Sequence, residues 1–155
     1  MNIHYQKGDA TQPVAEGFKI ITHICNDIGG WGRGFVLALS KRWKAPEQQY
    51  RKWYESKENF QLGEVQFVQV EADLVVANII GQHKVSPTNG IPPIRYEAVQ
   101  EGLQKVAQYA RMHQASVHMP RMGAGLAGGK WEEIEKIVEE ELVQKGIAVT
   151  VYNFA

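Results

Sequence analysis

The amino-acid sequence predicts an α/β fold built as a single domain. Short segments rich in β-branched and apolar residues alternate with longer segments in which apolar residues recur at helical spacing, and this pattern is typical of layered α/β proteins. A chain of 155 residues can build one core without disulfides or metals. It contains no internal repeat, low-complexity tract or linker. We therefore expect one domain over residues 1–155.

In its first half the chain is expected to form four strands and two helices. The strands are expected within residues 2–6, residues 18–25 and residues 63–80, the last range forming two strands with a turn at 71–73. Helices are expected over residues 35–43 and 45–56, with a break near Pro46, because proline disfavours helix in the residue before it and suits a first helical turn.

The second half begins with a loop, residues 81–93, in which three prolines and two glycines exclude regular structure. Apolar residues at helical spacing then predict a helix from about Arg95 to Met112 and another beginning near Trp131. Strands are expected at 115–120 and over the closing segment, "GIAVTVYNFA".

Composition narrows the classes of partner and the location. Lys and Arg number 17 and so do Asp and Glu, so no excess positive charge attracts DNA or RNA and general nucleic-acid binding is not expected. The single cysteine, Cys25, cannot close an internal disulfide, and the N-terminal segment lacks the features of a secretory signal. No apolar stretch is long enough to span a bilayer. We expect a cytoplasmic protein without membrane contact.

A glycine-rich segment, "RMGAGLAGG", lies between the expected strand at 115–120 and the last helix. Gly123, Gly125 and Gly128 match the dinucleotide fingerprint G-x-G-x-x-G, but a Rossmann unit places this loop near its start, whereas here the chain soon ends. A Walker A loop is excluded as well, because no glycine stands five residues before Gly129. Either the glycines permit close packing of helix on strand, or their backbone N–H groups bind an anion at the helix N-terminus.

A second glycine-rich loop favours the interpretation that the glycines bind an anion. Gly29, Gly30, Gly32 and Gly34 also lie between an expected strand and an expected helix. In open α/β sheets, ligands bind beyond the carboxyl ends of the strands, where such loops meet. Two loops of this kind can hold one diphosphate.

Four segments together resemble the macrodomains, the ADP-ribose-binding fold. They are "KGDAT", "THICNDIGGWGRGF", "MPRMGAGLAGGKW" and "VTVYNF", and they cover nearly the whole chain in order. The His-x-Cys-Asn segment is similar to that of ADP-ribose 1″-phosphate phosphatase-like members, and the Pro-Arg-x-Gly-x-Gly-Leu segment to that of the terminal ADP-ribose glycohydrolase and the antitoxin macrodomains. The resemblance implies a mixed β-sheet sandwiched between helices.

The resemblance also implies a ligand and the residues that contact it. The ligand is ADP-ribose or its 1″-phosphate, also as part of ADP-ribosylated macromolecules, with no further cofactor. Asp9 would accept a hydrogen bond from the adenine amino group, Asn26 would face the distal ribose, and Tyr152 or Asn153 would flank adenine. The implied contacts are Asp9, Ala10, Asn26, Gly30, Trp31, Gly32, Arg33, Gly34, Met122, Gly123, Ala124, Gly125, Leu126, Tyr152 and Asn153.

Several of these residues have plainer explanations that stay open. Asp9 also suits a turn or a helix N-cap, and Asn26 a loop cap. Trp31 and Tyr152 suit the core, and Arg33 a solvated surface.

His23 and Asn26 are the candidate catalytic residues. In the resembling branch, His23 faces the distal ribose, and histidine can serve as a nucleophile or as a general acid or base near neutral pH. A structural histidine at a strand end is the alternative. His83 and His118 are weaker candidates. No histidine pair has metal-ligand spacing with further ligands, so no metal site is expected.

Two positions depart from the glycohydrolase pattern. Ala127 stands where those members have an aspartate, and Gln82 where they have a lysine, although Lys84 follows two residues later. We therefore expect an ADP-ribose-binding protein that most readily removes phosphate from ADP-ribose 1″-phosphate. Hydrolysis of an ADP-ribosyl bond comes second, and a non-catalytic reader of ADP-ribose is the alternative.

Overall fold

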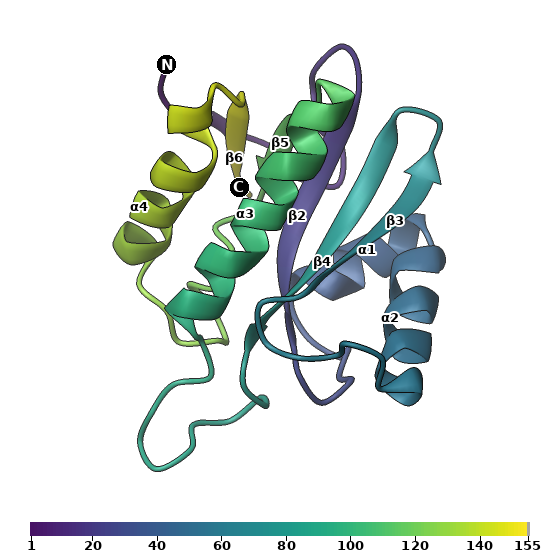
Figure 1. Cartoon of the computed structure of the whole chain (residues 1–155), viewed down its shortest axis with the longest axis vertical. Helices are drawn as coiled ribbons and strands as arrows, with labels where there is room; N and C mark the ends of the chain where they lie inside the picture. Colours follow the sequence, from purple (N-terminus) through teal and green to yellow (C-terminus); the bar gives the residue numbers. More distant parts are fainter. Residues whose placement is uncertain (155) are drawn as a thin grey trace.

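Six strands form one mixed β-sheet at the centre of the molecule (Figure 1). The computed structural model describes residues 1–154. The strands, in sheet order, are β1 (His4–Lys7), β6 (Val149–Asn153), β5 (Ser116–Met119), β2 (Lys19–Asn26), β4 (Leu74–Gln82) and β3 (Val65–Glu71). All neighbouring strands are parallel except β3 and β4, which form an antiparallel hairpin.

The central strands are apolar on both faces because helices cover both sides of the sheet. β2 and β4 read almost without interruption as buried residues. The hairpin turn lies where the sequence predicts it, and the Lys19 ammonium contacts the Asp73 carboxylate there at 2.9 Å.

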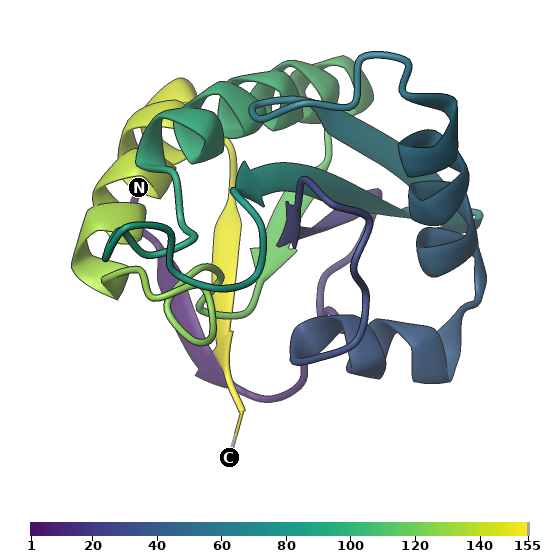
Figure 2. The same cartoon turned by 90° about the horizontal axis from the view of Figure 1, so that it is seen from below.

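Helices α3 (Tyr96–His113) and α4 (Trp131–Glu141) lie on one face, and α1 (Phe35–Arg42) and α2 (Ala45–Ser56) on the other (Figure 2). Each face has its own apolar cluster. The larger cluster joins Leu103 and Val106 of α3 to Ile134 and Val138 of α4. The smaller cluster, under α1 and α2, includes Leu39 and Tyr50. The predicted α/β class and the sandwich arrangement are confirmed.

Local sequence signals explain where the helices begin and end. Pro46 stands in the first turn of α2, where its missing N–H costs nothing. α3 is followed by Gln114, whose backbone has a left-handed conformation. The last helical segment is longer than α4 alone, because a short 3₁₀ turn, η1 (Val143–Lys145), follows and ends at Gly146 with φ +82°.

The five parallel strands end on the same side of the sheet, which Figure 2 views from the end. Their connections gather there, including both glycine-rich loops. Between residues 1 and 154 no helix has the length and apolar character needed to cross a membrane.

Candidate functional site: a cleft between two glycine loops

Two adjoining cavities, of about 270 Å³ and about 500 Å³, lie at the carboxyl ends of the strands. The smaller one is lined from one side by residues 33–36 and from the other by residues 120–123 and 125–127. The larger one is lined by residues 24–26, 30–33 and 85–86. Ile24, Arg33, Val36, Gln82 and Leu126 line both. Together these cavities form the cleft, and the two predicted glycine loops meet across it.

The N-terminus of α1 opens onto the cleft. Gly34 precedes the helix without a side-chain cap, and Phe35 and Val36, its first residues, line the smaller cavity. The first N–H groups of a helix lack intrahelical partners and carry a partial positive charge. The sequence also suggested the start of α4 as an anion site. However, residues 128–131, which lead into α4, do not line the cleft.

The glycines of the second loop serve different purposes. A Cβ atom on Gly129 would lie 2.4 Å from the Gly123 carbonyl oxygen, so Gly129 is required by packing. A Cβ atom on Gly125 would meet nothing within 4 Å, and Gly125 lines the smaller cavity. Close packing therefore explains Gly129, whereas Gly125 has open space beside it in the smaller cavity.

Asn26 organises the first glycine loop. Its Oδ1 accepts hydrogen bonds from the N–H groups of Ile28 (3.0 Å) and Gly30 (2.9 Å), and its Nδ2 donates to the Gly30 carbonyl (2.9 Å). The Tyr50 hydroxyl donates to the Asn26 carbonyl at 2.5 Å. An amide nitrogen has two hydrogens, of which the Gly30 carbonyl takes one, and Asn26 lines the larger cavity.

His23 lines the smaller cavity from β2 but is only 2% exposed. Asn78 donates from Nδ2 to the Pro46 carbonyl (3.3 Å) and to Gln66 (3.1 Å), so its Oδ1 is the atom that faces His23 at 2.5 Å. His23 therefore donates from Nε2, and its lone pair is on Nδ1, 4.0 Å from the Cys25 sulfur. Burial lowers the pKa of His23 to about 4, so the ring is neutral at pH 7.

The two long side chains of the first glycine loop differ in exposure. Trp31 belongs to the buried cluster below α1, and its indole N–H donates to Ser40 at 2.8 Å. Its edge also lines the larger cavity. Arg33 is exposed and lines both cavities.

Asp9 heads a turn after β1. Its Oδ1 accepts hydrogen bonds from the backbone N–H (2.8 Å) and the hydroxyl (2.7 Å) of Thr11. Its Oδ2 lies 3.7 Å from the Arg42 guanidinium of α1. Ala10, next in the chain, is buried. Asp9 thus stabilises the turn through Oδ1, while its Oδ2 atom can accept a further hydrogen bond. Neither cavity is lined by Asp9 or Ala10.

Tyr152 and Asn153 are the last residues of β6. Tyr152 is buried, whereas the Oδ1 atom of Asn153 accepts a hydrogen bond from Arg121 Nε at 2.8 Å. The exposed aromatic residue at this end is Phe154, 82% exposed, which sequence reasoning missed. Its signal was an aromatic residue near the end of the closing segment.

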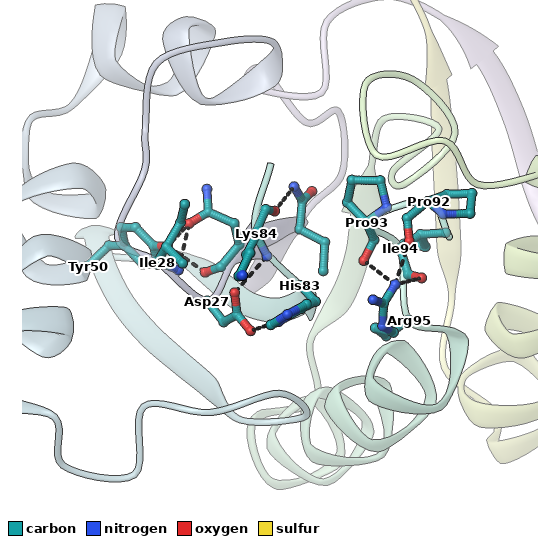
Figure 3. A network of polar contacts seen from close by, with 11 residues as sticks. Asp27, Ile28, Tyr50, His83, Lys84, Pro92, Pro93, Ile94 and Arg95 are labelled. Atoms are coloured by element: carbon teal, nitrogen blue, oxygen red, sulfur yellow. Dashed lines mark hydrogen bonds and ion pairs between the residues drawn. The ribbon is translucent and has the colours of Figure 1, made fainter. Parts of the chain in front are cut away.

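A carboxylate that sequence reasoning also missed joins the ends of β2 and β4 (Figure 3). Asp27 Oδ2 lies 2.7 Å from His83 Nδ1, and Asp27 Oδ1 accepts a hydrogen bond from the Lys84 N–H at 2.7 Å. Lys84 has a left-handed backbone, φ +58°, which is uncommon for a residue with a long side chain. The contacts of Asp27 with His83 and Lys84 hold the neighbouring residues, Asn26 and Gln82, beside the larger cavity.

The positions that depart from the glycohydrolase pattern carry no charge into the cleft. Gln82 lines both cavities, and its Nε2 donates to the Lys84 carbonyl at 2.9 Å. Ala127 is buried and its carbonyl accepts a hydrogen bond from the Ile94 N–H at 3.0 Å. Lys84 does not line either cavity.

Three further observations complete the site. Of the other loop residues, Ala124 packs partly buried against the larger core cluster, while Met122 and Leu126 line the smaller cavity.

Within residues 1–154, no three His, Cys, Asp or Glu side chains are grouped so as to hold a metal ion. A separate cavity of about 630 Å³ lies at the start of α3 and is lined by none of the predicted site residues.

Known proteins resemble this chain in both structure and sequence, although no family model matches it. A macrodomain protein from Streptomyces coelicolor is 49% identical, with a TM-score of 0.89 over 99% of this chain and 100% of that one. The chain therefore belongs to the macrodomain family. A Bacteroides thetaiotaomicron protein of unknown function is 63% identical, with a TM-score of 0.98 over 100% and 99% of the two chains.

Curated relatives carry more specific names. The mouse (Mus musculus) chromodomain-helicase-DNA-binding protein 1-like is 33% identical over 99% of this chain, which spans only 18% of that protein. An ADP-ribose 1″-phosphate phosphatase of Candida albicans is 26% identical over 89% of this chain and 92% of its own length. A DNA ADP-ribosyl glycohydrolase of Thermus aquaticus is 28% identical over 87% and 37%.

Proposed function

We propose that this macrodomain binds ADP-ribose in the cleft and removes phosphate from ADP-ribose 1″-phosphate. One observation carries the proposal. The side chains that line the two cavities include two arginines, Arg33 and Arg121, and no aspartate or glutamate. With the start of α1 opening onto the same space, the cleft suits a ligand with several negative charges.

The ligand's parts match different regions of the site. The diphosphate lies between Gly125 and the first N–H groups of α1, where a missing side chain leaves open space. The distal ribose occupies the larger cavity beside Asn26 and Gln82, where amide groups suit hydroxyls. Adenine lies at the opposite end, with its amino group on Asp9 and its face toward Phe154.

The reaction is hydrolysis of a phosphate monoester. A water oxygen forms a bond to phosphorus while the bond from phosphorus to the 1″ oxygen of ribose breaks. The water loses a proton and the departing oxygen gains one. His23, which lines the smaller cavity that adjoins the ribose position, is the proposed base, because its lone pair is on Nδ1 and the ring is neutral at pH 7. Arg33, which lines both cavities, neutralises the phosphate.

The names of several relatives support this reaction over its competitor. ADP-ribose 1″-phosphate phosphatases from yeasts match nearly the whole chain. The DNA ADP-ribosyl glycohydrolase relative raises a second hydrolytic reaction. A cleft without a lining carboxylate gives that reaction no acidic residue as general base.

The reader function remains the second candidate, because one observation favours it. His23 is almost fully buried and bonded to Asn78, as a purely structural histidine would be. A lowered pKa also weakens it as a base. A protein of this kind would bind ADP-ribose tightly without turning over its phosphate ester.

Turnover and binding measurements separate the two functions. The wild-type protein is expected to release phosphate from ADP-ribose 1″-phosphate and to bind ADP-ribose more tightly than AMP in calorimetry. His23→Gln, whose amide can still donate to Asn78, should lower phosphate release at least about a hundredfold with ADP-ribose affinity kept within about tenfold. Arg33→Ala should weaken the phosphorylated ligand more than ADP-ribose, and Arg111→Ala, on an exposed part of α3, should change neither.

Each outcome has a defined meaning. Tight ADP-ribose binding without any phosphate release would establish the reader. Equal affinity for ADP-ribose and AMP, or no binding of either, would overturn the proposed ligand. Unchanged turnover in His23→Gln would move the chemistry to another residue.

A further inference from the structure

One buried titratable residue has no part in the proposed reaction. His118 on β5 is 1% exposed. Its Nδ1 lies 2.7 Å from the Tyr152 hydroxyl and its Nε2 lies 2.7 Å from the Ser116 hydroxyl. Burial, aided by the nearby Lys19 cation, lowers the pKa of His118 to about 4, so the ring is neutral at pH 7.

The direction of these hydrogen bonds follows from what each group can donate. The Tyr152 oxygen accepts a hydrogen bond from the Val14 N–H at 3.0 Å. Because Tyr152 is buried, its own hydrogen needs an acceptor, and His118 Nδ1 is in reach. His118 then donates from Nε2 to Ser116, which is only half-buried and can place its hydrogen in water.

This chain of bonds ends on the loop that carries Asp9. The loop between β1 and β2 is mostly exposed from residue 12 to residue 17. It is attached at Gly8, whose N–H donates to the Asn153 carbonyl (3.0 Å), and at Thr11, whose hydroxyl accepts from Arg42 (2.7 Å). Tyr152 supplies the third attachment at Val14.

Tyr152 also supports the start of the loop. A Cβ atom on Gly8 would lie 3.5 Å from the Tyr152 ring, so the ring fills the space beneath that glycine. One side chain therefore contacts the loop on both sides of Asp9, at residues 8 and 14.

We propose that Tyr152 and His118 form a positioning pair that holds the Asp9 loop in its ligand-binding conformation, and that Tyr152 acts through Asp9 rather than by contacting adenine. The effect on ligand selection rests on the proposed function, in which the Asp9 carboxylate accepts a hydrogen bond from the adenine amino group. The pair thereby determines how strongly adenine is preferred over a base without that group.

Tyr152→Phe tests the pair because it removes the hydroxyl and keeps the ring under Gly8. In the free protein, hydrogen exchange at the Val14 amide should accelerate at least several-fold. ADP-ribose should bind roughly three- to tenfold more weakly, the range expected for one lost hydrogen bond. The preference for ADP-ribose over inosine diphosphate ribose, which carries an oxygen in place of the amino group, should shrink by a similar factor.

Tyr96→Phe is the matched control. The Tyr96 hydroxyl also accepts a hydrogen bond from a backbone N–H, that of Lys130 at 2.9 Å, but in a loop away from Asp9. This variant should keep the wild-type preference for adenine. His118→Phe should reduce the preference, and combining it with Tyr152→Phe should add little further loss, since the two residues act as one unit.

The readouts distinguish failure of this inference from failure of the proposed function. Unchanged Val14 exchange in folded Tyr152→Phe would overturn the positioning pair, whatever the protein binds. So would wild-type adenine preference in that variant. Absence of ADP-ribose binding by the wild-type protein would overturn the function, while accelerated Val14 exchange would still support the positioning pair.

Discussion

Single glycines in the second loop have separable effects on stability and on binding. Gly129 packs against the Gly123 carbonyl, whereas Gly125 faces open space in the smaller cavity. A side chain at the first position has to displace backbone, and a side chain at the second has to displace ligand. Variants at these two glycines therefore test packing and ligand binding separately.

Gly129→Ala should destabilise the protein by about 1–3 kcal/mol, because its Cβ atom would overlap the Gly123 oxygen. Gly125→Ala should change the free energy of unfolding by less than about 0.5 kcal/mol. Gly125→Glu should leave the fold intact and abolish ADP-ribose binding, since it adds bulk and negative charge where the diphosphate is proposed. Denaturant unfolding and calorimetry measure both effects, and normal ADP-ribose affinity in folded Gly125→Glu would mean that this glycine does not face the ligand.

The sequence predicted which site residues lie close together better than it predicted the hydrogen-bond partner of each side chain. The sequence brings His23, Asn26 and both loops to one end of the sheet, and the structure agrees. Yet the partner of His23 is Asn78, 55 residues away in the chain, and the partner of Asp27 is His83. Such pairings arise from strand register, which local patterns do not encode.

The helix α1 is the element with the most direct effect on the cleft. It has eight residues, no side-chain cap and no acidic residue in its first turn, so its positive end is left uncompensated by the chain itself. A helix in this condition favours an anion at its start. In the loop before it, Gly32 and Gly34 add no side chain to the cleft, whereas Arg33 lines both cavities.

Phe35→Pro should weaken ADP-ribose binding by roughly tenfold through loss of one N–H donor at the start of α1. Proline is tolerated at the first helical position. Gly34 before it has φ 81° and ψ −144°, outside the α region that a following proline disfavours. Phe35→Ala is the control because it loses the same ring but keeps the N–H. Equal affinity in the alanine and proline variants, measured by calorimetry, would exclude a role for that N–H group.

Most elements of the fold were predictable because their signals are local. Helical periodicity predicted α3 and α4, and Pro46 predicted where α2 begins. The 3₁₀ turn η1 was not predicted. No local sequence signal predicts the order of the strands in the sheet. This order places the first and last strands, β1 and β6, side by side, and only the resemblance to a known fold implied a mixed sheet.

For the molecule as a whole, two buried neutral histidines make stability depend on pH. The pKa values of His23 and His118 are lowered from 6.5 to about 4 by burial. Between about pH 4 and pH 6.5, these two histidines bind protons in the unfolded chain but not in the folded protein. Stability is therefore full above about pH 6.5 and falls as the pH drops toward 4.

Unfolding free energy should fall by up to about 1.4 kcal/mol per pH unit for each of the two histidines. Denaturant unfolding at pH 6.5, 6.0, 5.5 and 5.0 measures this slope while most carboxylates stay ionised. His118→Phe and His23→Gln should each remove part of it, and His4→Gln, at an exposed position, should not. A stability that is flat over this interval would mean that neither buried ring resists protonation.

The parallel pairing of β1 with β6 has a practical consequence for anyone handling the protein. In a parallel pair the two strands start at one side of the sheet and finish at the other, so His4 aligns with Thr150 and Lys7 with Asn153. β1 thus begins on the side away from the cleft, and β6 ends on the side of the cleft. An affinity tag or immobilisation linker belongs on the amino end, because the same attachment at the other end would lie on the side of the proposed binding cleft.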